Sequence, residues 1–453
     1  METKLKRKIT GLVFALVMVI TIFPPAPAGV SAATTWTVDD NGSADFSTIQ
    51  GAIDAASDGD TISVAAGTYY EHVIIDKDLT LIGEDPETTI IDGGGTGQVI
   101  IANGSWSSPG PSFTLEGFTI TNGFASGSSS HQLCAGISCF YSGPGVIRNC
   151  RIIGNYSNWP PYPNPIGYGG GIYLYNLGRH GVTDFRIENC LIANNYAGSK
   201  GGGIACYTES SPSIINCTIV DNSAWYDVED DVWVFHDSDP IIRNSIIGKL
   251  TIVASSPTPG NITYNDILSG PYIEGNISAD PLFTDPEAGD YHLQPSSPCI
   301  DVGDNITVPS WLTTDFEGDP RILDGNGDGD KVVDMGADEC YIVAATIGFD
   351  PATVNLKSKG KWITCYIELP EGYNVGDIDV DSILLNGEVE AEPRPLEIGN
   401  YDGDSVADLM VKFEQSAVQD TLEVGDEVGV MVTGEVEGTL FGGTDIIRVI
   451  DKG

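Results

Sequence analysis

The chain has 453 residues, of which 64 are Asp or Glu and 21 are Lys or Arg, so its formal net charge is −43. A surface this acidic repels phosphate groups, which argues against nucleic acids and anionic membranes as partners. The length is sufficient for two or three domains with full hydrophobic cores.

Residues 1–32 have the pattern of a secretory signal peptide. Basic residues between positions 4 and 8 precede an apolar run over residues 11–23, and small residues follow up to Ala32. The apolar run is shorter than the ~20 residues of a membrane-spanning helix. We therefore expect cleavage near Ala32, no membrane span in the mature chain, and a secreted or cell-surface protein. An uncleaved anchor is the alternative.

The mature chain is expected to begin with a strand at residues 35–38 and a short helix. Phe46, Ile49, Ile53 and Ala56 lie at helical spacing, which predicts one apolar helix face. We expect this helix to cap the first coil of a repeating structure, because it would shield an exposed sheet edge and an apolar interior.

A six-residue motif, Ile-x-Asn-Cys-x-(Ile), recurs at residues 147–152, 187–192 and 214–219. The alternation expected of a strand slips by one residue where Asn and Cys are adjacent. A bend between two short strands explains the slip, since Asn and Gly tolerate a left-handed backbone best. The same corner position is assigned to Gly117, Asn244 and Asn265.

A Gly-Ile motif at residues 136–137, 171–172 and 203–204 alternates with these corners. Together the two motifs predict coils of about 20 to 30 residues, stacked as a right-handed parallel β-helix with inward Ile and Cys. Here the chain resembles the pectin-lyase-like superfamily, which includes pectinesterases and surface repeat proteins without known activity. The cysteines of the corner motif are expected to be buried apolar residues.

The sequence divides into four segments. The signal peptide (1–32) is followed by the β-helix with its cap (33–300), a C-terminal cap with an acidic loop (301–341) and a β-sandwich (342–453). Short alternating strands between turn signals predict the sandwich, which resembles Ig-like appendages of microbial surface proteins. The fold class is therefore all-β. Whether Cys299 and Cys340 form a disulfide stays open.

Two acidic loops share the spacing N-x-D-x-D-x-x-x-D. They comprise Asn326, Asp328, Asp330 and Asp334, and Asn400, Asp402, Asp404 and Asp408. Alternating oxygen-bearing side chains in a turn converge on a hard cation, so we expect structural calcium, with ordinary acidic turns as the alternative. The first loop does not match a complete EF-hand, because Met335 occupies the position of its final Glu.

Aromatic residues in two insertions between coils are the candidate ligand-binding residues: Trp159 and Tyr162 in one, Trp225 and Tyr226 in the other. Loops on a rigid scaffold often bind ligands, and aromatic rings stack on sugars. The alternative is that these loops only pack against the coils.

We therefore expect a structural or adhesive protein that binds extracellular polysaccharide or other surface proteins. The alternative is a polysaccharide lyase, glycoside hydrolase or epimerase acting in a groove on the β-helix. No catalytic set is recognised, because the paired Asp motifs of pectinesterases and the motifs of polygalacturonases are missing. An enzyme is expected to show carboxylates, alone or with Arg or Lys, that converge in one groove near the aromatic residues.

Overall fold

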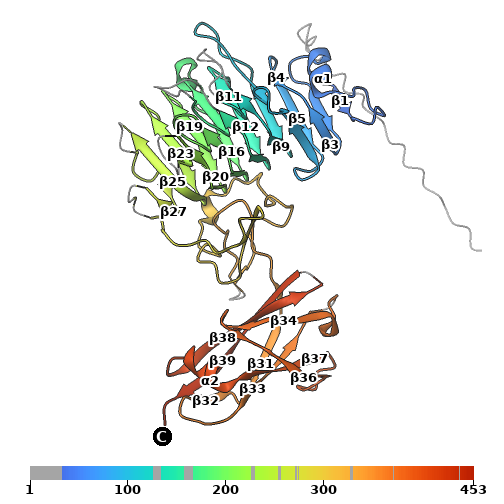
Figure 1. The fold of residues 1–453 in the computed structure, drawn as a ribbon, viewed down its shortest axis with the longest axis vertical. Coiled ribbons are helices and arrows are strands. Elements are labelled where there is room, and N and C mark those ends of the chain that lie inside the picture. The colour runs from blue at the N-terminus through green and yellow to red at the C-terminus, as the bar shows by residue number, and fades with distance from the viewer. Residues whose placement is uncertain are drawn as a thin grey trace, which may run out of the picture.

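The computed structural model describes residues 33–125, 134–157, 167–225, 230–253, 257–270, 273, 275–326, 330–370, 372–437 and 439–452. Parallel coils run from α1 to β27, and an irregular segment and an antiparallel sandwich lie below their flank (Figure 1). No helix among the described residues has the length and apolar character needed to cross a membrane. The expected signal peptide lies outside the described residues.

Three parallel sheets form the walls of the β-helix. Sheet A contains, in order, β1 (Thr35–Val38), β2 (Thr61–Val64), β5 (Leu79–Gly83), β8 (Phe113–Glu116), β12 (Gly145–Arg148), β16 (Phe185–Glu188), β20 (Ser213–Ile215), β24 (Ile241–Arg243) and β26 (Ile262–Thr263). Sheet B contains β3 (Gly67–Tyr70), β6 (Thr89–Asp92), β9 (Thr119–Thr121), β13 (Arg151–Ile153), β17 (Leu191–Ala193), β21 (Thr218–Val220) and β25 (Ile246–Val253), with β27 (Asp266–Ser269) paired to β25.

Sheet C forms the third wall and joins sheet B through the long strand β25. It contains β4 (Val73–Ile74), β7 (Ile100–Ile101), β11 (Ile137–Phe140), β15 (Ile172–Tyr175), β19 (Ile204–Tyr207) and β23 (Val232–Phe235). The short strands β10 (Phe124–Ala125), β14 (Tyr156–Ser157), β18 (Tyr196–Ala197) and β22 (Ser223–Ala224) connect sheets B and C. The short helix η1 (Leu177–His180) follows β15.

The N-terminal helix covers the first coil, as expected from the sequence. Helix α1 (Ile49–Ala55) begins after Thr48, whose side chain accepts a hydrogen bond from the Gly51 N–H. Its apolar side chains Ile49 and Ile53 are buried in the interior of the β-helix. The helix is shorter than the apolar spacing suggested, because Phe46 precedes it and pairs with Val38 in a bridge.

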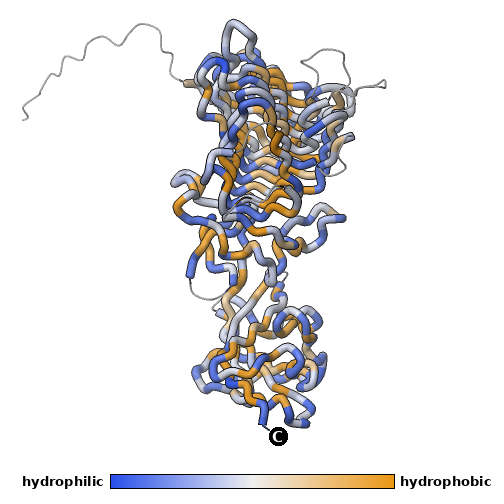
Figure 2. The backbone as a smooth tube through the Cα atoms, turned by 90° about the vertical axis from the view of Figure 1, so that its left-hand side faces the viewer, coloured by the Kyte–Doolittle hydropathy of each residue, from blue (hydrophilic) through white to orange (hydrophobic). Residues whose placement is uncertain are grey.

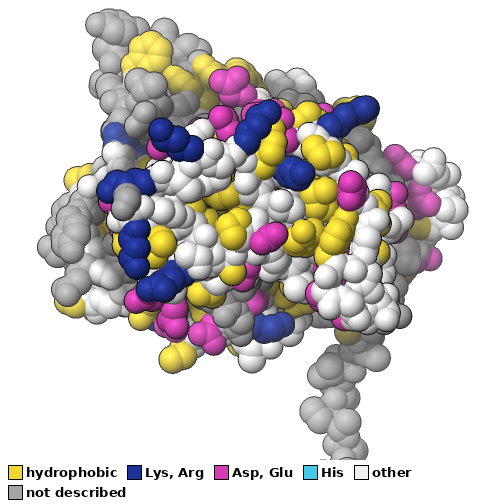
Figure 3. All heavy atoms as spheres, turned by 90° about the horizontal axis from the view of Figure 1, so that it is seen from below, with side chains coloured by type: hydrophobic (Ala, Val, Ile, Leu, Met, Phe, Trp, Pro, Cys, Tyr) yellow, Lys and Arg dark blue, Asp and Glu magenta, His cyan; other side chains and the backbone are white. Residues whose placement is uncertain are grey.

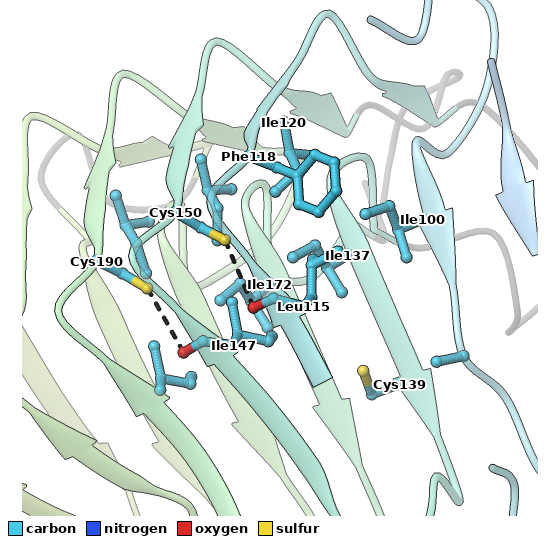
Figure 4. Packing of buried hydrophobic residues seen from close by; sticks show 14 of the residues in the cluster. Ile100, Leu115, Phe118, Ile120, Ile137, Cys139, Ile147, Cys150, Ile172 and Cys190 are labelled. Carbon is cyan, nitrogen blue, oxygen red and sulfur yellow. Dashed lines mark hydrogen bonds between the residues drawn. The ribbon is translucent and has the colours of Figure 1, made fainter. Parts of the chain in front are cut away.

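The inner face of each coil repeats the same apolar residues. Hydrophobic stretches recur from coil to coil (Figure 2), and Ile147 lies between Leu115 and Ile187 in the register of sheet A. The thiols of Cys150 and Cys190 point into this core, 3.7 Å from the Leu115 carbonyl and 3.6 Å from the Ile147 carbonyl (Figure 4). All nine cysteines are free and buried, so Cys299 and Cys340 are not bridged.

The corners between sheets A and B confirm the prediction made from the repeated motif. Their φ angles are 76° at Gly117, 49° at Asn149, 54° at Asn189, 51° at Asn216 and 49° at Asn244. The residues that precede these asparagines pair strand to strand along sheet A, so the corners form one column. The Asn189 side-chain amide donates to the Asn149 Oδ1 atom at 3.1 Å.

One corner assignment was wrong. Arg243 pairs with Thr263, so the residue after Thr263 occupies the next corner, and this residue is Tyr264, with φ of 57°. Asn265 lies one position further along. There its side-chain oxygen accepts the Ser245 N–H at 2.9 Å.

Residues 279–341, which we call the flanking segment, contain β28 (Phe283–Asp285), β29 (Asp290–Leu293) and η2 (Asn305–Thr307). We expected residues 301–341 to close the C-terminal end of the coils. Their contacts instead run along the corner between sheets A and B, where the Asn189 amide donates to the Thr314 carbonyl at 2.8 Å. Arg321 also donates to the Asn189 Oδ1 atom at 2.9 Å. The flanking segment thus covers one side of the last coils.

The C-terminal part is a sandwich of two mainly antiparallel sheets around a separate core, in which β30 and β32 pair with β39 in parallel. One sheet contains β30 (Val343–Ala344), β39 (Thr439–Ile450), β38 (Gly425–Val436), β34 (Ile378–Leu385) and β35 (Val389–Glu390), with β32 (Thr353–Asn355) beside β39. The other contains β31 (Thr346–Asp350), β33 (Trp362–Glu368), β37 (Asp408–Glu414) and β36 (Glu392–Gly399). Helices η3 (Val375–Asp377) and α2 (Gln415–Asp420) complete it. Seen from below, this end shows Lys and Arg side chains among Asp and Glu (Figure 3).

Candidate functional site

The outer face of sheet C carries aromatic side chains on successive coils. Side chains alternate along each strand, so Ile172 and Leu174 enter the core while Tyr173 and Tyr175 point outward. The strand register places Phe140, Tyr175, Tyr207 and Phe235 in one column, and Tyr173, Ala205 and Trp233 in the next. We call the six aromatic residues of these columns the aromatic face.

The rings of the aromatic face pack against one another. The ring centroids of Tyr175 and Tyr207 are 5.6 Å apart with an interplanar angle of 26°. The corresponding values are 5.2 Å and 46° for Tyr207 and Phe235, and 4.9 Å and 13° for Trp233 and Phe235. Phe140, Tyr173 and Trp233 are buried, whereas Tyr175, Tyr207 and Phe235 are half-buried. The buried rings therefore support a strip of partly exposed rings.

The tyrosine hydroxyls of this strip are uncharged. A phenol is neutral at physiological pH, and burial raises the pKa of both the Tyr175 and the Tyr207 hydroxyl further. A neutral phenol both donates and accepts hydrogen bonds. The strip thus combines apolar ring surface with polar edges.

The aromatic face continues toward the residues after β7. The Arg179 guanidinium lies 3.0 Å from the centroid of the Trp106 ring, which is 64% exposed. The His180 ring contacts the Ser105 carbonyl at 3.0 Å, and Trp106 packs edge-on against Tyr141. This side of sheet C therefore adds an exposed indole and a cation.

The structure describes only part of the predicted ligand-binding set. Trp159, Tyr162 and Tyr226 lie outside the described residues. Trp225 is 63% exposed, but it follows β22 and has no ring contact with a described residue. Near it, the Tyr156 and Tyr196 rings stack at 4.5 Å between the short connecting strands.

Sequence reasoning missed Tyr175, Tyr207 and Phe235, although a signal was present. Each ends a strand of alternating residues, Ile-Tyr-Leu-Tyr, Ile-Ala-Cys-Tyr or Val-Trp-Val-Phe. Two of these strands begin at the Ile of the Gly-Ile motif. Attention to the outward positions of the repeat would have located the aromatic face.

The first acidic loop differs from the predicted arrangement. Asp328 lies outside the described residues. The Asp334 carboxylate is buried and accepts the backbone N–H groups of Asp301 and Cys340, each at 2.7 Å. Burial raises the pKa of Asp334 to about 7. Asp334 is thus used within the flanking segment, and the described acidic residues of this loop form no group of three close carboxylates.

The second acidic loop brings two of its four predicted ligands together. Ligand oxygens of Asp402 and Asp404 lie within 4.8 Å of each other and of Glu368, which ends β33. Partial burial, followed by the nearby Asp404 and Asp402 carboxylates, raises the pKa of Glu368. The other two predicted ligands are engaged locally: the Asn400 oxygen accepts the Gly403 N–H, and the buried Asp408 carboxylate accepts the Tyr401 N–H.

A cavity of about 210 Å³ lies between the outer face of sheet B and the flanking segment. We call it the junction cavity. Its lining includes Glu87, Arg151, Leu191 and Thr218 from the coils, and Tyr291, His292, Phe316, Glu317, Ala337 and Asp338 from the flanking segment. Arg151 pairs with Glu87 at 2.8 Å, and the His292 Nε2 atom lies 2.9 Å from a Glu317 oxygen. Carboxylates and an arginine therefore converge here, on sheet B rather than on the aromatic face.

A family model described as "Right handed beta helix region" matches residues 90–247. The matched region is a right-handed β-helix. No curated protein matches the sequence.

Solved structures similar to the chain include two pectin methylesterases. The enzyme from carrot is 15% identical, with a TM-score of 0.29, covering 57% of this chain and 92% of that chain. PemA from Erwinia chrysanthemi is 16% identical, with a TM-score of 0.29, covering 54% of this chain and 72% of that chain. TM-scores this low do not establish a shared fold, so the fold assignment depends on the family model and on the strand register.

Proposed function

We propose that this protein is secreted or held at the cell surface, and that it binds extracellular polysaccharide through the aromatic face. The observation that carries the proposal is the strip formed by Tyr175, Tyr207 and Phe235, three half-buried rings in register on successive coils. Aromatic rings stack on the apolar faces of sugars, and their polar edges hydrogen-bond to hydroxyl groups.

The scaffold suits a long polymer for two reasons. Successive coils rise by ~4.8 Å, so the strip repeats along the β-helix axis and presents several rings to one extended chain. The rings are already held by their packing, which lowers the entropy lost on binding. The net charge of −43 favours neutral over acidic polysaccharides.

The test is retention on a panel of immobilised neutral and acidic polysaccharides. We expect Tyr207→Ala and Phe235→Ala to reduce retention on a neutral polymer. Tyr70→Ala is the matched control, because Tyr70 is 74% exposed but lies on sheet B. Equal retention of all four proteins, wild type included, would contradict the proposal, and Trp225→Ala tests the loop contribution separately.

The alternative function is a polysaccharide lyase, hydrolase or epimerase, and one observation favours it. The junction cavity brings the carboxylates of Glu87, Glu317 and Asp338 near Arg151, beside the aromatic residues Tyr291 and Phe316. An enzyme would release unsaturated products or new reducing ends from the same panel. Loss of those products in Glu317→Gln, with retention unchanged, would place catalysis in this cavity and not on the aromatic face.

We also propose that calcium has a structural role in the second acidic loop, bound by Asp402, Asp404 and Glu368. Carboxylate oxygens are the ligands that calcium prefers, and the ion would relieve their mutual repulsion. Added calcium should raise the melting temperature of the wild type, and Glu368→Gln should reduce that shift. Identical shifts in both proteins would refute this assignment. Calcium in the first loop stays a prediction.

A further inference from the structure

We propose that His292, Glu317 and Asp338 form a binding site for a divalent transition metal, such as zinc, at the junction cavity. One ligand atom from each side chain lies within 4.8 Å of the others. The His292 Nε2 atom and the Glu317 Oε1 atom are 2.9 Å apart. The three ligand atoms therefore lie close together, and side-chain movements would bring them to metal-ligand distances around one ion.

The three ligands come from different parts of the flanking segment. His292 lies on β29, Glu317 lies in the loop after Asp315, and Asp338 lies in the stretch that follows Met335. A metal bound to all three would connect these parts directly. It would also hold them beside Arg151 and Leu191, which line the cavity from the coils.

The backbone around Glu317 is held in place by Asp315. The buried Asp315 carboxylate accepts the N–H groups of Glu317, Gly318 and Asp319 at 3.0, 2.9 and 2.8 Å. Its other oxygen accepts the Glu339 N–H at 3.0 Å. The residues that carry two of the ligands are therefore fixed to one another without a metal, and such preorganisation favours binding.

The backbone around Asp338 is held by Arg321, which is 1% exposed. Its guanidinium donates to the Ala337 carbonyl at 2.7 Å and the Gly336 carbonyl at 3.0 Å, and it pairs with Glu339 at 2.7 Å. Within residues 336–339, Asp338 is the residue whose carboxyl side chain lines the cavity.

The Asp338 carboxylate has fewer hydrogen-bond donors than the neighbouring carboxylates. Other inward carboxylates of the flanking segment are stabilised by donors: Asp301, Asp315, Asp334 and Glu339 all accept backbone N–H groups. Asp338 is half-buried, its carboxylate accepts no hydrogen bond from any described residue, and burial raises its pKa. A bound divalent cation would give this carboxylate a direct partner.

The ligand set selects the kind of metal. One imidazole nitrogen and two carboxylate oxygens suit zinc and its first-row neighbours, whereas calcium and magnesium prefer oxygen ligands alone. Three protein ligands leave a fourth position open toward the cavity, as in zinc sites that hold a water or another ligand. The competing arrangement is an ion pair, in which Glu317 raises the pKa of His292 to about 10.

The experiment is a titration of the metal-free full chain with cobalt, followed by zinc, in excess magnesium to occupy non-specific acidic sites. We expect one equivalent of cobalt to bind with visible ligand-field absorption, and zinc to displace it. His292→Gln, Glu317→Gln and Asp338→Asn should each weaken this binding by at least ~10-fold. Glu87→Gln is the matched control, because Glu87 lines the same cavity but is not one of the three proposed ligands.

The proposal is overturned if the wild type does not bind one equivalent of cobalt, or if the three ligand variants bind cobalt as tightly as the wild type does. Circular dichroism and melting of the metal-free variants check that they fold. X-ray absorption of the zinc-loaded wild type is independent of any variant. It should show a single imidazole among nitrogen and oxygen neighbours, and a shell without imidazole would also overturn the site.

Discussion

Sheets B and C belong to the same coils, yet their outer faces have opposite roles. On sheet B the outward residues Leu191 and Val220 join Tyr291, Ile300 and Met335 of the flanking segment in one buried cluster. On sheet C the outward aromatic rings pack among themselves, and Tyr175, Tyr207 and Phe235 stay partly exposed. The inward residues of both sheets are alike, so the outward residues decide which face is covered and which is available for binding.

The largest expected effect comes from removing the contact that holds the flanking segment on its face. Arg321→Met leaves Glu339 and several carbonyl groups without a buried partner. We expect a loss of about 3–5 kcal/mol in unfolding free energy, measured by denaturant titration. Arg448→Met is the control, because its pair with Asp426 is exposed, and its stability should be unchanged. Similar values for both variants would mean that Arg321 does not anchor the segment.

The stability contributed by the turn between sheets B and C should depend on pH. The side-chain amides of Asn155, Asn195 and Asn222 form a buried ladder that ends on the Asp231 carboxylate, 2.8 Å from Asn222. Burial raises the pKa of Asp231 from 3.8 to about 7. Its stabilising contribution is therefore fully present below about pH 4 and is lost as the pH rises through about 7.

Asp231→Asn should remove this dependence. The difference in unfolding free energy between wild type and variant should change by about 3–4 kcal/mol between pH 4 and pH 8, at one pKa unit per about 1.4 kcal/mol. Denaturant titrations at several pH values measure it. The contributions of the other titrating groups cancel in this difference. If the unfolding free energies of the two proteins change in parallel with pH, ionisation of Asp231 does not destabilise the fold.

The corner shared by both faces offers a smaller test. Asn149 has a left-handed backbone with φ of 49°. Asn149→Ala places a less tolerant residue there and removes the hydrogen bond from Asn189, so we expect a loss of about 1–2 kcal/mol. Asn149→Gly keeps the backbone relaxed and should lose less. The reverse order in thermal or denaturant unfolding would show that backbone strain does not govern this corner.

The smallest effect concerns the polar edge of the aromatic face. Tyr207→Phe keeps the ring but removes the hydroxyl, so it should weaken polysaccharide binding by about 0.5–1.5 kcal/mol, the value of one hydrogen bond. The melting temperature should not change, because Tyr207 is half-buried and no described residue bonds to its hydroxyl. Unchanged binding would assign the contribution of this residue to ring stacking alone.

The sequence alone was sufficient for features that depend on local repetition. Asn149, Asn189 and Asn216 recur because each corner needs a left-handed residue, and the alternation around them revealed the β-helix. The position of Asn265 was misjudged because its corner has Tyr264 instead, and no local rule favours a tyrosine there.

Only the tertiary structure decided how distant segments meet. Glu368 joins Asp402 and Asp404 because β33 pairs with β37, and no spacing in the sequence announces that pairing. Likewise, the flanking segment lies along sheet B because Leu191 and Val220 offer an apolar surface that its own side chains bury. Contacts of this kind depend on the shape of two folded surfaces, which periodicity along one chain does not encode.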